Sequence, residues 1–193
     1  MESSVAIRSK EFVVIGTESS VCNSYLVLKR NHDKFSTIDN KVIMTYICNQ
    51  GDGFRTAQYI TEKIKFEQLQ NELPLTPEVV SNVIQDKVHY SLRRNPLNHT
   101  FVVGGKDDEA YQLYTIDPYG AMYECKFTVV GIAGYFCYGI LDNEYKDDIS
   151  LEEAIEAVKK CYEVLKENCV INLENVDLRI LDSSGIRDIS ISL

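Results

Sequence analysis

The stretch that decides the fold class is residues 53–93, GFRTAQYITEKIKFEQLQNELPLTPEVVSNVIQDKVHYSLR. Its apolar residues recur every three or four positions in two runs, which is the spacing of one helical face. The first run is Ala57, Ile60 and Ile64, and the second is Val80, Ile84, Val88 and Leu92. Thr76-Pro77 marks a helix start between the runs, because threonine suits the N-cap and proline the first helical position. Residues 53–93 therefore predict two consecutive helices.

Runs of β-branched and aromatic residues, which are typical of strands, lie on both sides of this helical pair. They are residues 12–15, 25–28 and 42–47 before it, and residues 101–103, 111–116 and 121–130 after it. Asp117-Pro118-Tyr119-Gly120 has the residue order of a type I turn, so we expect it to join two antiparallel strands. We expect Gly104-Gly105 to end the strand that precedes it.

A second helical pair and two final strands complete the order. Apolar spacing predicts a helix over residues 133–143, and Ser150-Leu151-Glu152-Glu153 has the spacing of a capping box that opens another. Residues 176–181 and 186–191 predict the last strands. Strands in blocks and helices in pairs predict an α+β fold with antiparallel sheets packed face to face and a helix pair on each outer face. No linker interrupts residues 1–193, which we interpret as one domain.

The charge balance argues against two classes of partner. The chain has 193 residues and a net charge of −9, from 20 Lys plus Arg against 29 Asp plus Glu. Nucleic acids and anionic membranes are bound through clustered basic residues, so we expect neither as a partner. No apolar run approaches the roughly 20 residues needed to cross a bilayer. The sequence also lacks a signal peptide at Met1-Glu2-Ser3-Ser4, so we expect the chain in the cytoplasm and nucleus.

Motifs that carry chemistry are sparse. The sequence contains no G-x-S-x-G, H-E-x-x-H, Walker or G-x-G-x-x-G pattern, and we expect no cofactor and no metal. The histidines His32, His89 and His99 lie far apart, and we expect each to be solvated or hydrogen-bonded and structural. We expect the acidic segment 107–109 to be a solvated loop and segment 147–148 to favour the positive end of the following helix.

The cysteines are expected to be reduced, buried and chemically idle, because a cytosolic chain keeps thiols and free cysteine behaves as a small hydrophobe. Their spacings contain no C-x-x-C pair that would indicate zinc or redox chemistry. They are Cys22, Cys48, Cys125, Cys137, Cys161 and Cys169.

Several short strings, in this order and at these separations, resemble the beta-type subunits of the proteasome core particle over nearly the whole chain. The strings are Val13-Val14-Ile15 leading to Thr17-Glu18-Ser19, His32-Asp33-Lys34, Gly51-Asp52, and Gly139-Ile140-Leu141-Asp142-Asn143-Glu144-Tyr145 before the Ser150 helix. Residues 92–96, 104–107 and 113–117 are most similar to the non-catalytic subunit at the fourth ring position, called beta type-2 in vertebrate naming.

The resemblance implies a four-layer αββα sandwich of the N-terminal-nucleophile hydrolase fold, which agrees with the predicted order of elements. Active members of the family attack the peptide carbonyl with the hydroxyl of an N-terminal threonine. A lysine on the third strand and an aspartate at the end of the second strand tune that nucleophile. A serine before the third helix and a second aspartate support it.

Matching the family's positions one by one places Glu2 where the threonine should be and Glu18 at the second-strand aspartate. A carboxylate at position 2 offers neither the hydroxyl nor the amine base that threonine chemistry needs. Lys34 falls at the lysine position, and we expect it to form a charged pair with Glu18. Cys48 stands where active members use a glycine whose N–H serves the oxyanion.

The two supporting groups are missing from this sequence. Ile132 replaces the serine, and the position of the second aspartate falls near Asn168 or Cys169. We therefore predict that the chain has no catalytic residues. The positions of the degenerate site are Glu2, Glu18, Lys34, Cys48 and Ile132.

The leading hypothesis is a non-catalytic structural subunit of the 20S proteasome beta ring, which supports assembly and the chamber for ATP- and ubiquitin-dependent protein degradation. Its partners would be beta-type and alpha-type subunits in stacked heteromeric rings. The alternative is an active peptidase that uses Ser3 or Ser4. It needs a register slip, which turns a side chain to the other face or displaces it by roughly 7 Å. A third hypothesis, an unrelated acidic α+β binding module, depends on composition alone.

Overall fold

The computed structural model describes residues 2–23, 26–48, 50–169 and 173–193. The helices are α1 (Gln50–Asn71), α2 (Pro77–Leu92), α3 (Gly134–Glu144) and α4 (Leu151–Asn168). One sheet contains β1 (Ser3–Arg8), β2 (Val13–Glu18), β10 (Phe127–Gly131), β11 (Asn175–Asp182) and β12 (Gly185–Ser192). A second sheet contains β5 (Phe35–Ile38), β6 (Val42–Ile47), β7 (Thr100–Lys106), β8 (Tyr111–Ile116) and β9 (Met122–Glu124). A separate hairpin contains β3 (Val21–Asn23) and β4 (Leu26–Lys29).

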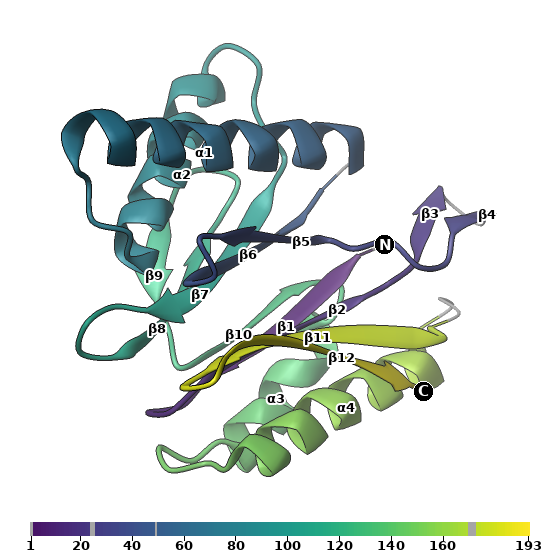
Figure 1. Cartoon of the computed structure of the whole chain (residues 1–193). Coiled ribbons are helices and arrows are strands. Elements are labelled where there is room, and N and C mark those ends of the chain that lie inside the picture. Colours follow the sequence, from purple (N-terminus) through teal and green to yellow (C-terminus); the bar gives the residue numbers. More distant parts are fainter. Residues whose placement is uncertain (1, 24–25, 49, 170–172) are drawn as a thin grey trace.

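The two larger sheets stack face to face, and each carries one helix pair on its outer face (Figure 1). The first sheet has the order β10-β1-β2-β11-β12 and is covered by α3 and α4. The second has the order β5-β6-β7-β8-β9 and is covered by α1 and α2. This arrangement of antiparallel sheets confirms the predicted αββα sandwich and the α+β class.

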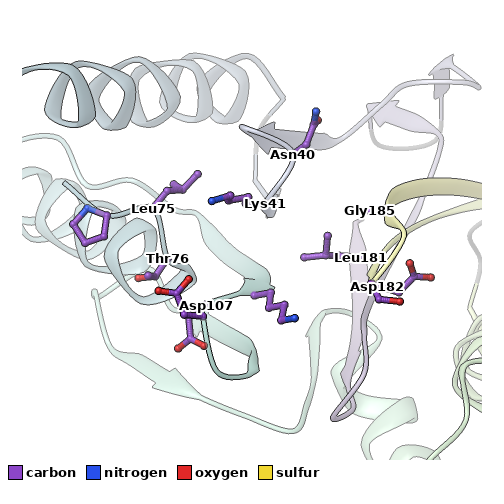
Figure 2. Close-up of a pocket in the computed structure, with 12 residues that line it drawn as sticks. Asn40, Lys41, Leu75, Thr76, Asp107, Leu181, Asp182 and Gly185 are labelled. Atoms are coloured by element: carbon purple, nitrogen blue, oxygen red, sulfur yellow. The ribbon is translucent and has the colours of Figure 1, made fainter. Parts of the chain in front are cut away.

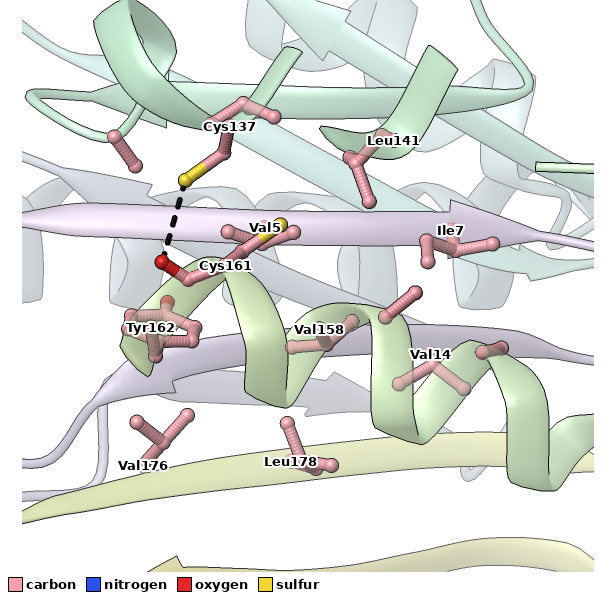
Figure 3. Close-up of a cluster of buried hydrophobic side chains, with 14 of the residues drawn as sticks. Val5, Ile7, Val14, Cys137, Leu141, Val158, Cys161, Tyr162, Val176 and Leu178 are labelled. Atoms are coloured by element: carbon pink, nitrogen blue, oxygen red, sulfur yellow. Dashed lines mark hydrogen bonds between the residues drawn. The ribbon is translucent and has the colours of Figure 1, made fainter. Parts of the chain in front are cut away.

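The strands β1 and β2 of the first sheet are buried on both faces because they lie between the helices and the second sheet. In β1, Val5 and Ile7 pack in the cluster under α3 and α4 (Figure 3), whereas Ala6 packs in the cluster between the sheets. In β2, Val14 faces the helices and Val13 faces the second sheet. A strand between two layers therefore shows a nearly continuous apolar run instead of alternation.

The helix predictions are confirmed together with their caps. The apolar stripes of α1 and α2 form the core against the second sheet; its helical members include Ala57, Ile60, Ile64, Val80, Ile84 and Val88. The Thr76 hydroxyl caps α2 by accepting from the Val79 N–H at 3.2 Å. The predicted capping box of α4 is present, because Ser150 Oγ accepts from Glu153 N–H at 3.3 Å and Ser150 N–H donates to Glu153 Oε2 at 2.9 Å.

Residues 121–130 form two strands in different sheets, so the prediction of a single strand is wrong. β9 pairs with β8, whereas β10 pairs with β1. The chain changes sheets between two consecutive residues: Cys125 N–H donates to the Leu113 carbonyl at 2.9 Å, and the Lys126 carbonyl accepts from Arg8 N–H at 2.8 Å. Neither glycine nor proline separates the two strands, so the pattern of the sequence does not reveal the crossing.

The glycine pair continues its strand instead of ending it, which corrects another prediction. β7 runs through Gly104 and Gly105 to Lys106. A Cβ on Gly104 would lie 2.6 Å from Val13 Cγ1, and a Cβ on Gly105 would lie 2.8 Å from the Lys41 carbonyl oxygen. Close packing between the layers therefore explains the glycines. The sequence prediction also missed β1, β3 and β5.

Candidate functional site

Four chain segments meet at one end of the sandwich and carry the residues of the predicted site. β1 and β2 are antiparallel neighbours, with Ser4 opposite Thr17, so Glu2 before β1 lies near Glu18 at the end of β2. Lys34 precedes β5, and Cys48 follows the neighbouring strand β6. The Thr45 hydroxyl donates to the Lys34 carbonyl at 3.0 Å and joins these two segments.

The Lys34 ammonium is fully buried and surrounded by acceptors. Its Nζ lies 2.8 Å from Glu18 Oε1 and 3.6 Å from Glu2 Oε1. It also donates to the Ser20 carbonyl at 2.8 Å. The predicted charged pair with Glu18 is therefore present, and it extends to a second carboxylate that the sequence prediction did not assign to Lys34.

Glu18 is the centre of a hydrogen-bond network as well as an ion pair. Its Oε2 accepts from both the backbone N–H and the hydroxyl of Ser3, each at 2.9 Å. Burial raises the pKa of the Glu18 carboxyl, while the Lys34 charge and these hydrogen bonds oppose the rise. A buried carboxylate needs this number of partners, because an unpaired charge inside a protein is very unfavourable.

Glu2 occupies the position between the lysine and the segment after β6. The Cys48 N–H donates to Glu2 Oε2 at 3.3 Å. Burial raises the pKa of the Cys48 thiol to about 12, with the Glu2 carboxylate adding to the rise, so the thiol stays protonated at neutral pH. Gly131 has φ +79°, and a Cβ there would collide with the Glu2 carbonyl oxygen, so this position favours glycine.

Both serines of the alternative hypothesis are buried inside β1. The Ser3 hydroxyl donates to Glu18, whereas the Ser4 hydroxyl donates to the Gly16 carbonyl at 3.1 Å. Tyr162 of α4 donates its hydroxyl to the same Gly16 carbonyl at 2.9 Å and lies 3.3 Å from the Ser3 carbonyl. Ser3 is 3% exposed and Ser4 is 0% exposed, so neither hydroxyl is open to a substrate in this conformation.

The structure does not bring the remaining predicted positions into this network. Ile132 is half-buried between β10 and α3, and its aliphatic side chain offers no hydrogen bond. The Asn168 side chain donates to the Val164 carbonyl of its own helix at 2.8 Å. Cys169 caps α4 through its N–H.

The sequence prediction did not include an arginine clamp beside the site. Arg179 on β11 binds both carboxylate oxygens of Asp188, at 2.7 and 2.9 Å, and its Nη2 lies 3.2 Å from Asp33 Oδ2. Its Nη1 donates to the Thr37 hydroxyl of the second sheet at 3.1 Å. Because Asp33 precedes Lys34, the clamp fixes the segment that carries the lysine. An isolated arginine in a strand gives no signal of this role in the sequence.

A cavity of about 580 Å³ lies at the opposite end of the sandwich (Figure 2). Turns of both sheets line it, with Lys41 from one side and Leu181 and Asp182 from the other. Asp107 also lines it, but its Oδ1 accepts from the backbone N–H groups of Glu109 and Ala110. The acidic segment therefore folds its own loop, as expected of a structural turn.

The histidines and the acidic segment before α4, which the sequence analysis also considered, make structural contacts. His89 is exposed, but His99 is buried. His99 stacks on Phe101, and a backbone hydrogen bond with Asp52 opposes the fall in its pKa that burial causes, so the ring is structural, as expected. Asp147 pairs with Lys126 at 2.6 Å, and this partner lowers the pKa of its carboxyl.

The cysteine prediction is partly wrong. Cys137 and Cys161 are buried free thiols, but four others are only half-buried because they lie in the hairpin, after a strand, between strands or at a helix end: Cys22, Cys48, Cys125 and Cys169. The described part of the chain contains no group of three or more His, Cys, Asp or Glu residues arranged to hold a metal ion. Among the described helices, none has the length and apolar character needed to cross a membrane.

Comparison with known proteins gives a consistent result over nearly the whole chain. A family model described as "Proteasome subunit" matches residues 2–181. The chain is 41% identical over 186 residues to the "Probable proteasome subunit beta type-4" of Encephalitozoon cuniculi, covering 96% of this chain and 94% of that protein.

Two further relatives are more distant. The chain is 28% identical over 189 residues to the "Proteasome subunit beta type-2-A" of Arabidopsis thaliana, covering 97% of this chain and 93% of that protein. It is 27% identical over 192 residues to the "Proteasome subunit beta type-4" of Saccharomyces cerevisiae, covering 98% and 97%. The names beta type-2 and beta type-4 both agree with the ring position that the sequence strings resemble.

Proposed function

Because the chain belongs to the proteasome subunit family, we propose that it is a non-catalytic structural subunit in the beta ring of the 20S core particle. Family membership excludes the hypothesis of an unrelated acidic binding module. The names of the relatives support a beta-type position, and the proposal adds that this position carries no peptidase site of its own.

The observation that carries the proposal is the contact of the buried Lys34 ammonium with two carboxylates, Glu2 and Glu18. Lys34 is the group that would tune a nucleophile, and here two carboxylates lie within 3.6 Å of its Nζ. The two carboxylates and the Ser20 carbonyl surround this Nζ, so the lysine is engaged by partners inside the fold. The arrangement supports a role in stabilising this end of the sandwich.

The partners in this proposal are beta-type and alpha-type proteasome subunits in stacked heteromeric rings. The chain would hold neighbouring catalytic subunits in register around the chamber, and the particle would degrade proteins in an ATP- and ubiquitin-dependent manner in the cytoplasm and nucleus. The proposal involves no cofactor, nucleic acid or membrane.

Assembly is tested by purifying the full-length chain with a cleavable affinity tag and measuring the native mass and the protein content of what copurifies. We expect a particle many times heavier than the 22.0 kDa chain, containing both alpha-type and beta-type subunits. A tagged chain that elutes as a 22.0 kDa monomer, although the untagged particle is intact in the same cells, would refute the structural role.

Inactivity is tested in the same particle with a peptide vinyl sulfone, which labels nucleophilic hydroxyls at peptidase sites. We expect the probe to label other subunits and leave this chain unmodified, as judged by intact mass. Ser3→Ala should leave peptide hydrolysis per particle unchanged for all substrates that the particle cleaves. The labelled subunits serve as the internal control for probe reactivity.

The enzyme alternative has one supporting observation, the 2.9 Å hydrogen bond from the Ser3 hydroxyl to Glu18. A carboxylate that accepts from a hydroxyl can act as its base. Removal of Met1-Glu2 would be needed to give Ser3 a free amine. Intact mass decides this point: a chain that begins at Ser3 and carries the probe would replace our proposal with the serine hydrolase.

A further inference from the structure

Two buried cysteines are neighbours where α3 packs against α4, with the Cys137 sulfur pointing at the Cys161 backbone (Figure 3). The Cys137 thiol donates to the Cys161 carbonyl, with 3.5 Å between sulfur and oxygen. Both residues are 0% exposed, and both are free thiols. Neither belongs to the site at the end of the sandwich.

The two thiols differ in acidity because each is the main neighbour of the other. The side-chain contact with Cys161 lowers the pKa of Cys137, and the same contact with burial raises the pKa of Cys161. Cys137 lies on α3, the less firmly packed helix, so it is the thiol that meets a peroxide first, and Cys161 on α4 is the thiol that closes the disulfide. Burial raises the pKa of the half-buried Cys48 and Cys125, which makes them poorer nucleophiles.

Access to the pair depends on α3, which is weakly held. Cys137 and Leu141 are its buried residues. Ala133 at the N-cap has no side-chain oxygen for the first N–H groups, and a Cβ at Gly139 would meet nothing within 4 Å. Elements with few buried contacts open locally long before the whole fold unfolds. Opening of α3 exposes Cys137 while Cys161 stays on the better capped α4.

We propose that Cys137 and Cys161 form a peroxide-sensing disulfide that joins α3 to α4. The Cys137 thiolate attacks hydrogen peroxide; its sulfur forms a bond to one oxygen, the O–O bond breaks, and the released hydroxide takes a proton to become water. The Cys161 sulfur then attacks the Cys137 sulfur of the sulfenic acid, the S–O bond breaks, and the hydroxyl leaves as water with the Cys161 proton. Two thiols lose two electrons, and one peroxide gains them.

The disulfide would change the mobility of one outer face. Tyr135 on α3 is 89% exposed and Tyr138 is 42% exposed, so α3 presents an aromatic surface. A link to α4 across residues 137–161 prevents the local opening of α3 and holds that surface in place. Small thiols such as glutathione would reverse the link, because thiol–disulfide exchange runs in both directions. This inference does not depend on assembly or on the absence of peptidase activity.

The test uses the full-length chain in its native assembly, treated with hydrogen peroxide, unfolded in an alkylating reagent and digested with trypsin. We expect alkylated thiols to fall from six to four and a linked pair of peptides, residues 127–146 and 161–166, to appear. Dithiothreitol should restore all six thiols. The link should also slow hydrogen exchange of the α3 amides at least about tenfold, because closure removes the opening step.

Cys169→Ser is the matched control, because Cys169 lies at the end of α4 and its peptide, residues 167–179, is distinct from both linked peptides. This variant should form the same link, whereas Cys137→Ala and Cys161→Ala should not. Three results would overturn the proposal: linkage of Cys161 to Cys169, oxidation of Cys137 to sulfinic acid without a link, and loss of the exposed thiols while Cys137 stays reduced.

Discussion

Replacing Lys34 with methionine should lower the free energy of unfolding by about 3–5 kcal/mol, the range for removing one partner of a buried ion pair. Methionine fills much of the space of the lysine stem, so the loss comes mainly from the charge and its hydrogen bonds. Lys34 is 0% exposed at its side chain and Glu18 is 2% exposed, so water cannot replace the missing cation. Both the Glu18 carboxylate and the Ser20 carbonyl lose a donor at 2.8 Å.

The deficit of Lys34→Met should grow with pH. Burial raises the pKa of Glu18 above its ordinary value of 4.5, and Lys34 opposes that rise. A carboxyl whose pKa is higher in the folded state stabilises the fold fully below its unfolded pKa and loses that contribution as the pH rises through the folded value. Removing Lys34 strengthens this loss, so the variant should lie closer to the wild type at about pH 5 than at about pH 7.5.

The assay is urea unfolding of the full-length chain, followed by circular dichroism, for Lys34→Met, Glu18→Gln and the double variant. The double variant should be more stable than the sum of the single losses predicts, by at least about 2 kcal/mol, because the buried Glu18 carboxylate is no longer left without its cation. Lys160→Met is the control, since Lys160 pairs with Glu144 on the surface, and its unfolding midpoint should not move. Additive losses in the cycle, or a deficit that is constant with pH, would refute the buried ion pair.

Three further substitutions test separate contacts. Tyr162→Phe removes a buried hydroxyl that contacts two carbonyls, and should destabilise the chain by about 1 kcal/mol without changing its packing, as measured by urea unfolding. Ser150→Ala removes the helix cap of α4 and should also lower the free energy of unfolding by about 1 kcal/mol. Faster hydrogen exchange should be confined to the first turn of that helix. Gly131→Ala should destabilise by more than about 1 kcal/mol, because φ is +79° and the new Cβ collides with the Glu2 carbonyl. Gly139→Ala is its control and should be neutral or stabilising by up to about 1 kcal/mol, since a Cβ there meets no atom within 4 Å. Equal losses for the two glycine variants would contradict the steric explanation.

The sequence was sufficient to predict those parts of the architecture that depend on local spacing alone. The stripes of residues 53–93 and the caps at Thr76 and Ser150 depend on local spacing, and the structure places all of them as predicted. The crossing at Cys125-Lys126 could not be predicted, because two strands that serve different sheets have the same local pattern. Which sheet a strand joins is decided by long-range hydrogen bonds, and these leave no periodicity in the sequence.

The site shows the same division between what the sequence indicates and what the fold decides. The resemblance to the family led us to predict a charged pair between Glu18 and Lys34, and the structure confirms their contact at 2.8 Å. The hydrogen bonds from Ser3 to Glu18 could not be predicted, because they depend on the register of β1 against β2. The Arg179 clamp also reaches Thr37 and Asp33, which are 142 or more positions away in the chain, and only the stacked sheets bring them together.

The position of Glu2 supports the proposal that this end of the sandwich is not a peptidase site. A peptidase stabilises a negative charge that appears only in the transition state, so its donors must be free in the resting enzyme. Here the Glu2 carboxyl group accepts from the Cys48 N–H and lies 3.6 Å from Lys34 Nζ. The Cys48 N–H and the Lys34 ammonium, which in a peptidase would serve the transient charge, here contact Glu2 and stabilise the folded state. Retention of Lys34 is then expected on stability alone, because two buried or nearly buried carboxylates, Glu18 and Glu2, need its charge.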